Sequence, residues 1–176
     1  EFRRVLFRSI VDLQERKGQL PLSGLHQLAR TIAPMGWHLE FLMHVNEFPD
    51  LRRQLGSLPV PLVFGHLGYV PAHLGPSEGM DGLIELARNG QAWIKMTAPY
   101  RLTPDPYPYA CVAPWAHLLA SSVPERLLWG SDWPHVFIKS AMPNDGDLLD
   151  LMASWLSSST RMQTIWVDNP RSIYGT

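Results

Sequence analysis

The sequence contains little of several features that mark common protein classes. Cys111 is the only cysteine in 176 residues, which excludes an internal disulfide and a zinc site built from cysteines. The formal net charge is -1 and no basic stripe is present, so we expect no nucleic-acid partner. No apolar run reaches the roughly 20 residues of a membrane span, so we expect no membrane partner. A single cysteine fits a reducing compartment, and we expect a cytoplasmic protein.

The first nine residues, 1–9, differ from the rest of the chain. They are rich in arginine, lack an initiator methionine and begin with Glu1-Phe2, a pair that a common cloning site encodes. They show no secretory pattern, because charges interrupt their apolar residues. We expect a vector- or adapter-derived segment here, with a genuine short basic strand as the alternative. Residues 10–176 are then expected to form a single domain, since a chain of this length can bury one core.

Apolar runs typical of strands alternate with segments of helical periodicity along the rest of the chain. The expected strands are 37–43, 61–64, 92–96 and 127–130. The expected helices begin near residues 23, 49, 77, 110, 147 and 159. This alternation predicts an α/β fold with a parallel sheet and right-handed crossovers. No glycine-rich phosphate loop follows any strand, so part of a (β/α) barrel, which needs about 250 residues when complete, is favoured over a nucleotide-binding sheet.

Polar residues that can do chemistry follow the expected strands, in the order His66, Lys95, Arg101, Asp132 and His135. The carboxyl ends of parallel strands share one face, so we expect these side chains on one rim. Asp132 can take a proton from water, His66 can orient that water, and Arg101 can hold a carboxylate or a developing oxyanion. The set predicts a hydrolytic site.

Each of these residues also has a purely structural interpretation. Asp132 can cap the turn after a strand, and His66 can bond a nearby backbone group. Lys95 can extend from a strand end toward water. Arg101 can pair with Asp105 alone. The hydrolytic interpretation therefore depends on these residues occurring together at successive strand ends.

Several motifs of this chain belong together in one known family. They are Phe64-Gly65-His66-Leu67-Gly68, Trp93-Ile94-Lys95-Met96, Tyr100-Arg101-Leu102, Gly130-Ser131-Asp132-Trp133-Pro134-His135, Met142-Pro143-Asn144-Asp145-Gly146-Asp147 and Asn169-Pro170-Arg171. In this combination the chain resembles the amidohydrolase-related (amidohydrolase 2) family, and within it the branch of 2-pyrone-4,6-dicarboxylate lactonase-like hydrolases. The resemblance extends from about residue 10 to the C-terminus, and the motif at 130–135 is its most specific part.

The resemblance implies a (β/α)8 TIM barrel. By register, this chain would carry about strands five to eight with their helices, as an N-terminally truncated fragment that lacks the His-x-His pair of strand one. Asp132 would then be the general base that activates water, and His66 the strand-six histidine. Arg101 would match an arginine after strand seven that binds a substrate carboxylate.

The resemblance and the positions of residues at strand ends together indicate which residues contact the substrate. Tyr69 stands where the lactonase branch usually has an arginine, so one carboxylate clamp is absent. Together with Arg101, the expected substrate-binding residues are Tyr69, Lys95 and His135. No metal-binding residue is expected, because the strand-five histidine of metal-using branches has no matched counterpart and His44 is displaced from that position.

These features together predict a hydrolase that opens a lactone or cyclic ester with water activated by an aspartate. The expected partner is a small carboxylate-bearing lactone, and a homo-oligomer is possible. No cofactor is expected. The alternatives are a sister-branch decarboxylase or amidohydrolase that depends on a divalent metal such as zinc, and a non-catalytic truncated fragment.

Overall fold

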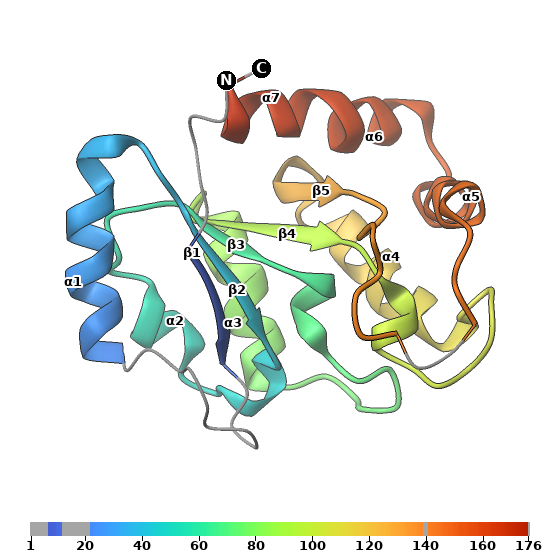
Figure 1. Cartoon of the computed structure of the whole chain (residues 1–176), viewed down its shortest axis with the longest axis horizontal. Coiled ribbons are helices and arrows are strands. Elements are labelled where there is room, and N and C mark those ends of the chain that lie inside the picture. The colour runs from blue at the N-terminus through green and yellow to red at the C-terminus, as the bar shows by residue number, and fades with distance from the viewer. Residues whose placement is uncertain (1–6, 12–21, 139–140, 176) are drawn as a thin grey trace.

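A parallel sheet forms the centre of the computed structural model, which describes residues 7–11, 22–138 and 141–175. The strands are β1 Phe7–Val11, β2 Leu39–Met43, β3 Leu62–Phe64, β4 Ala92–Met96 and β5 Leu127–Trp129. Their hydrogen-bonded order is β1-β2-β3-β4-β5, and every pair is parallel. Each strand lies beside its sequence neighbour, as in a (β/α) barrel, and all carboxyl ends reach one edge (Figure 1). The expected α/β fold is confirmed.

Helices connect the strands and follow the last one. The α-helices are α1 Leu22–Ile32, α2 Leu51–Leu55, α3 Glu78–Arg88, α4 Ala113–Ser122, α5 Asp145–Leu156, α6 Ser159–Gln163 and α7 Asn169–Tyr174. The 3-10 turns are η1 Ala33–Met35, η2 Val45–Glu47, η3 His66–Tyr69, η4 Pro99–Arg101, η5 Ala110–Val112 and η6 Pro124–Arg126, and η7 Thr164–Asp168 is a π-helical segment. Helix α7, which begins at Asn169, was not among the helices expected from the sequence.

Helix α3 shows how local sequence sets these boundaries. The Ser77 hydroxyl accepts a hydrogen bond from the Met80 backbone N–H, which satisfies one of the free donors at the helix start. Glu78 lies in the first turn and Arg88 in the last, as the helix dipole favours. Met80 and its neighbours at helical spacing are buried against the sheet side of the core. The helix expected at this position is confirmed.

The strands alternate between two faces of the sheet. On β4, Ala92, Ile94 and Met96 join the large core that the helices cover, whereas Trp93 belongs to a second cluster on the opposite face. Lys95 also points to that opposite face, because successive side chains of a strand alternate. In a barrel the face away from the helices is the interior. Polar residues on this inner face therefore point toward the part of a barrel where substrates bind at the strand ends.

Strand β1 was missed by the sequence analysis. Phe7, Arg8 and Ser9 lie within the segment set aside as adapter-derived, yet the structure pairs β1 with β2, with Phe7 opposite Leu39. The position of these residues in the sheet agrees with the alternative given for this segment, a genuine short strand. Parallel pairing depends on backbone groups, so it tolerates an arginine between apolar residues. The origin of residues 1–9 stays a prediction. With β5 as the eighth barrel strand, β1 takes the place of the fourth.

The C-terminal segment closes the sheet at the start of its strands. The Asn169 amide donates to the backbone oxygens of Pro124 (2.8 Å) and Leu127 (2.7 Å), which fixes α7 at the beginning of β5. Ile173 packs with the inner-face cluster of Trp93 and Leu128. Figure 1 shows α6 and α7 following one another along the top of the view. The inner face is therefore covered at one end and carries its polar groups at the other.

Candidate active site

The residues expected at successive strand ends do meet at the inner face of the sheet. A pocket of about 240 Å³ lies there. Its lining is Glu40, Gly65, His66, Lys95, Thr97, Trp129, Gly130, Asp132 and Tyr174. Three of the predicted site residues, His66, Lys95 and Asp132, thus line one cavity although they come from three different strands.

His66 begins η3 and is separated from the end of β3 at Phe64 by Gly65 alone. Its backbone lies in the left-handed region with φ of 51°, which is uncommon for a residue with a side chain. The Nδ1 atom lies 2.8 Å from the hydroxyl oxygen of Thr97, the residue after β4. The Nε2 atom lies 3.8 Å from Oδ1 of Asp132, which is longer than a direct hydrogen bond. The two groups therefore face each other across a small gap within the pocket.

The two oxygens of the Asp132 carboxylate have different surroundings. Oδ2 accepts hydrogen bonds from Tyr100 OH (2.9 Å) and Arg101 Nε (2.9 Å), and Arg101 Nη2 lies 2.8 Å away. Oδ1 is the oxygen that faces His66. The backbone of Asp132 has φ of 70°, a conformation that Asp tolerates better than most residues. One oxygen is thus held in place while the other faces the pocket.

Arg101 is bonded to the predicted base and not to Asp105. Its Nη2 atom also donates to the backbone oxygen of Val136 at 2.8 Å, so the guanidinium ties the turn η4 to the loop after β5. Burial lowers the pKa of Arg101, but the hydrogen bond and negative charge of Asp132 outweigh it and raise the pKa above its ordinary value. The arginine therefore stays a cation and neutralises Asp132. It does not line the pocket.

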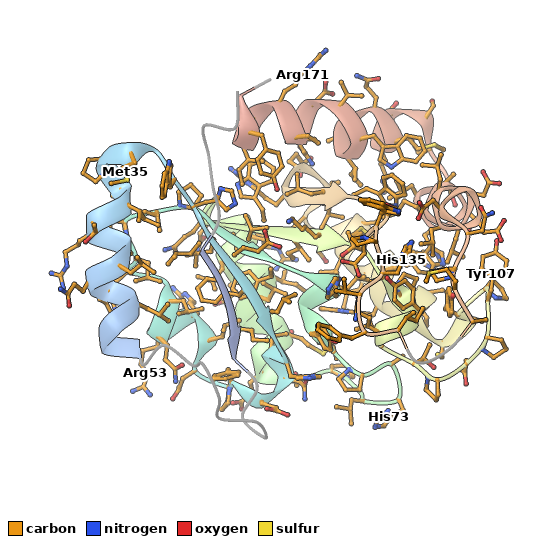
Figure 2. The ribbon with its side chains drawn as sticks, in the orientation of Figure 1. Met35, Arg53, His73, Tyr107, His135 and Arg171 are labelled. Atoms are coloured by element: carbon orange, nitrogen blue, oxygen red, sulfur yellow. The ribbon has the colours of Figure 1, made fainter. Side chains whose placement is uncertain are left out.

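Tyr100, His135 and Asp145 extend the contacts of Asp132 away from the pocket. Tyr100 OH lies 2.8 Å from Nδ1 of His135, and Nε2 of His135 lies 2.9 Å from Oδ1 of Asp145. Burial, the hydrogen bond to Asp132 and the Asp132 charge together raise the pKa of the Tyr100 phenol, so it stays protonated. Figure 2 shows His135 inside the loops at the carboxyl end of the sheet. No role for Tyr100 or Asp145 was predicted from the sequence.

The structure places His135 differently from the substrate contact that was expected. His135 is only 4% exposed, lies behind Asp132 and does not line the pocket. The position of Tyr69 agrees better with the expected contact to the substrate. Its ring makes edge contacts with the rings of His66 (5.4 Å between centroids) and His44 (4.7 Å). His135 therefore supports the site from behind, and Tyr69 lies beside the His66 ring.

A second ion pair crosses the pocket wall. Nζ of Lys95 donates to Oε2 of Glu40 at 2.8 Å, joining β4 to β2 across β3. Glu40 is only 3% exposed, whereas a quarter of the Lys95 side chain remains accessible. Burial, followed by the Glu40 charge, raises the pKa of the nearby Tyr174 phenol to about 12. The pair places a cation at the pocket wall. Glu40 was not among the predicted site residues, because a single glutamate in a short apolar run carries no sign of its partner.

Among the residues that the structure describes, no group of three or more His, Cys, Asp or Glu side chains is placed to hold a metal ion. Within the same residues, none of the helices combines the length and apolar character needed to cross a bilayer.

Comparison with known proteins shows which family this chain belongs to. The 4-sulfomuconolactone hydrolase of Rhizobium radiobacter is 36% identical over 149 residues, which are 80% of this chain and 50% of that protein. The 2-pyrone-4,6-dicarboxylate hydrolase of Comamonas testosteroni is 31% identical over 164 residues, 88% of this chain and 54% of that protein. The chain thus spans about half the length of the curated relatives it matches.

Solved structures support the same assignment. An apo crystal structure of an Agrobacterium tumefaciens protein superposes with a TM-score of 0.81 at 28% identity, covering 96% of this chain and 60% of that one. The partial coverage agrees with the expected part of a TIM barrel. The amidohydrolase family model matches residues 1–176. The chain therefore belongs to the amidohydrolase family, as its motifs indicated.

Proposed function

We propose that the protein containing this chain hydrolyses a lactone that carries an acidic group, with Asp132 as the general base. The observation that carries the proposal is the unequal environment of the two Asp132 oxygens, because Oδ2 is bonded to Tyr100 and Arg101 while Oδ1 faces the pocket. A base needs one oxygen directed at its proton donor and a side chain that does not rotate away. The 4-sulfomuconolactone hydrolase relative carries out chemistry of this class.

In the proposed reaction, a water molecule in the gap between His66 and Asp132 attacks the lactone carbonyl. Asp132 Oδ1 takes the water proton as the new C–O bond forms, and His66 orients the water or the developing oxyanion. The ring C–O bond then breaks. The proton passes from Asp132 to the departing ring oxygen, which returns the carboxylate to its starting state. No metal is needed to balance these steps.

The proposed substrate carries a carboxylate or sulfonate because of the cation at the pocket wall. Lys95 is held by Glu40 yet remains partly accessible, so it can donate a further charge-assisted hydrogen bond to an acidic group. Arg101 is the second candidate, and an anion could reach it only by sharing the guanidinium with Asp132. Tyr69 would contact the substrate beside His66. A cytoplasmic location and assembly into a homo-oligomer remain expectations.

The test is an assay of the longest open reading frame that contains this chain. The substrates are 4-sulfomuconolactone, 2-pyrone-4,6-dicarboxylate and an uncharged lactone of similar ring size. Hydrolysis is measured as the decrease in lactone absorbance. Parental protein should open at least one acidic lactone and prefer it to the uncharged one, and Lys95→Met should reduce that preference. No hydrolysis of any lactone would refute the proposal and favour a non-catalytic chain. Hydrolysis only after zinc addition would favour the metal-dependent alternative.

A further inference from the structure

A continuous series of hydrogen-bonding distances runs from the pocket to the surface. It leads from Asp132 Oδ2 to Tyr100 OH (2.9 Å), from there to His135 Nδ1 (2.8 Å), and from His135 Nε2 to Asp145 Oδ1 (2.9 Å). Asp145 is the exposed end, with 48% of its side chain accessible, whereas His135 is buried. These four residues are called the relay below.

The relay needs one more hydrogen for its three contacts than Tyr100 and a neutral His135 supply. Its three contacts each require one hydrogen between two heavy atoms. Tyr100 supplies one, and a neutral imidazole supplies one, because one of its nitrogens is an acceptor. Two ionised carboxylates supply none. With neutral His135, one contact would bring two acceptors together without a hydrogen, so the third hydrogen must be the second N–H of an imidazolium or a carboxyl O–H.

The direction of the Tyr100 hydrogen bond excludes a carboxyl O–H on Asp132, and Asp145, the exposed end of the relay, is taken as a carboxylate. Tyr100 donates to Asp132, so its oxygen must accept from Nδ1–H of His135. Nε2 then needs its own hydrogen to reach the Asp145 carboxylate. Both nitrogens of His135 are therefore protonated in this arrangement.

The charge balance agrees with the hydrogen count. An imidazolium at His135 and the guanidinium of Arg101 together match the carboxylates of Asp132 and Asp145, which gives a net charge of zero. A neutral His135 would leave one negative charge uncompensated in a partly buried cluster, which is unfavourable. The titratable or charged groups around the His135 ring are those already named, with Asp147 as the next acid on α5 and Tyr109 packed against Tyr100.

We propose that His135 is an imidazolium in the resting site, held by Tyr100 and Asp145, and that it acts through Tyr100 as a positioning residue for Asp132. The imidazolium fixes the Tyr100 hydrogen on the side of Asp132 Oδ2, so Asp132 stays ionised with Oδ1 directed at the pocket.

The first test reads the protonation of His135 without any assay of activity. Imidazole ¹⁵N spectra of the labelled chain distinguish an imidazolium from either neutral tautomer, and His135→Gln identifies the signal among seven histidines. We expect the imidazolium form at pH 7. In Asp145→Asn the imidazolium form of His135 should be lost at a lower pH than in the parent. Asp147→Asn, which removes a neighbouring acid from the same helix turn, should leave that pH unchanged. A neutral His135 at pH 7 would overturn the proposal, and carboxyl ¹³C spectra would then show whether Asp132 or Asp145 carries the third hydrogen.

The second test measures the effect on catalysis, and it rests on the proposed hydrolytic function. Tyr100→Phe keeps the ring but removes the link between His135 and Asp132. In the longest reading frame containing the chain, kcat should fall about tenfold, below the range for a direct acid or base because Tyr100 acts through Asp132, with KM little changed. Tyr109→Phe removes a neighbouring hydroxyl outside the relay and should leave kcat as in the parent.

The outcomes of the two tests separate the proposals. Parental activity should decline at alkaline pH as His135 loses its proton, and in Asp145→Asn this decline should begin at lower pH. An unchanged pH profile in Asp145→Asn, with normal folding by circular dichroism, would refute the positioning role while leaving the hydrolytic function intact. A protein that opens no lactone but retains the His135 imidazolium would refute the proposed function alone.

Discussion

Asp132 and Glu40 are both pocket carboxylates paired with a cation, and the comparison shows two uses of an ion pair. Asp132 follows a strand in a loop and has bonds to Tyr100 and Arg101, with one oxygen directed at His66. Glu40 lies within β2, is almost fully buried and bonds Lys95. The first arrangement leaves the carboxylate accessible to chemistry. The second leaves the cation accessible.

The two pairs also differ in what fixes them. Glu40 and Lys95 are held by the sheet itself, since β2, β3 and β4 are joined by backbone hydrogen bonds. Asp132 and Arg101 belong to loops, and their positions depend on side-chain bonds between those loops, including that of Arg101 to Val136. Substitutions at Asp132 should therefore alter reactivity most, whereas substitutions at Glu40 should alter stability most.

Asp132→Asn should have the largest effect. An asparagine keeps the size of the side chain but cannot accept the water proton, so kcat should fall by about 10²–10⁴-fold, the contribution of a general base. The measurement is steady-state lactone hydrolysis, with circular dichroism to confirm folding. Asp105→Asn, an exposed acid outside the pocket, is the control. If Asp132→Asn turned over at nearly the parental rate, Asp132 would be a turn cap.

Glu40→Gln should mainly destabilise the fold. It leaves the Lys95 ammonium beside a buried neutral amide, and breaking such a pair from one side costs about 3 kcal/mol. Urea unfolding of the chain measures this loss. The double variant Glu40→Leu/Lys95→Met replaces both partners by apolar groups and should unfold near the parental midpoint. A stability loss in the double variant equal to that of Glu40→Gln would argue against the pair as its cause.

Asn169→Ala should weaken the attachment of α7 to the sheet. It removes both donors to the Pro124 and Leu127 oxygens, a loss of about 2 kcal/mol in the free energy of unfolding. Asn89→Ala at the exposed end of α3 should change stability by less than about 0.5 kcal/mol. Urea titrations of both variants make the comparison, and equal midpoints would mean that Asn169 contributes no more than a surface amide.

Arg101→Met should have the smallest effect of these four substitutions. Its effect on substrate binding should depend on whether the lactone carries a charge. We expect KM for an acidic lactone to rise about tenfold through loss of a charge-assisted bond, with no such rise for an uncharged lactone. Because Arg101 also bonds Asp132, kcat should fall for both substrates. The kinetic constants on the two lactones separate these effects. An equal KM change for both would show that Arg101 only supports Asp132.

The strands and their carboxyl ends could be predicted because apolar runs and glycine-proline boundaries mark them locally. The limits expected for β4 are those observed, and His66 and Asp132 line one pocket as their positions after strands required. The start of α5 was placed two residues late, because the capping side chain is Asn144 and not a residue nearer Asp147. Local pattern thus predicts elements well and their caps less well.

The partners of the site residues could not be predicted, because they come from distant parts of the chain. Glu40 and Lys95 are 55 residues apart, and only parallel pairing through β3 brings them together. Tyr100 and His135 belong to the loops after β4 and β5, which the direct pairing of these two strands brings together. β1 was missed because its arginine-rich surroundings have no strand-like composition, while its pairing with β2 uses backbone groups alone. The roles of Asp132 and Arg101 were predicted from their residue types at strand ends and from the family resemblance, and they stay predictions.

The attachment of α7 has a consequence for proteolysis. Tyr174 belongs to the last helix yet lines the pocket that contains Asp132, so the C-terminal helix contributes one side chain to the pocket lining. Arg171 is exposed, and Figure 2 shows it pointing outward above α7. Cleavage after this arginine would detach Ile173 and Tyr174 without cutting any strand. A protein cleaved there would keep its strands but lose the Tyr174 side chain from the lining of the pocket.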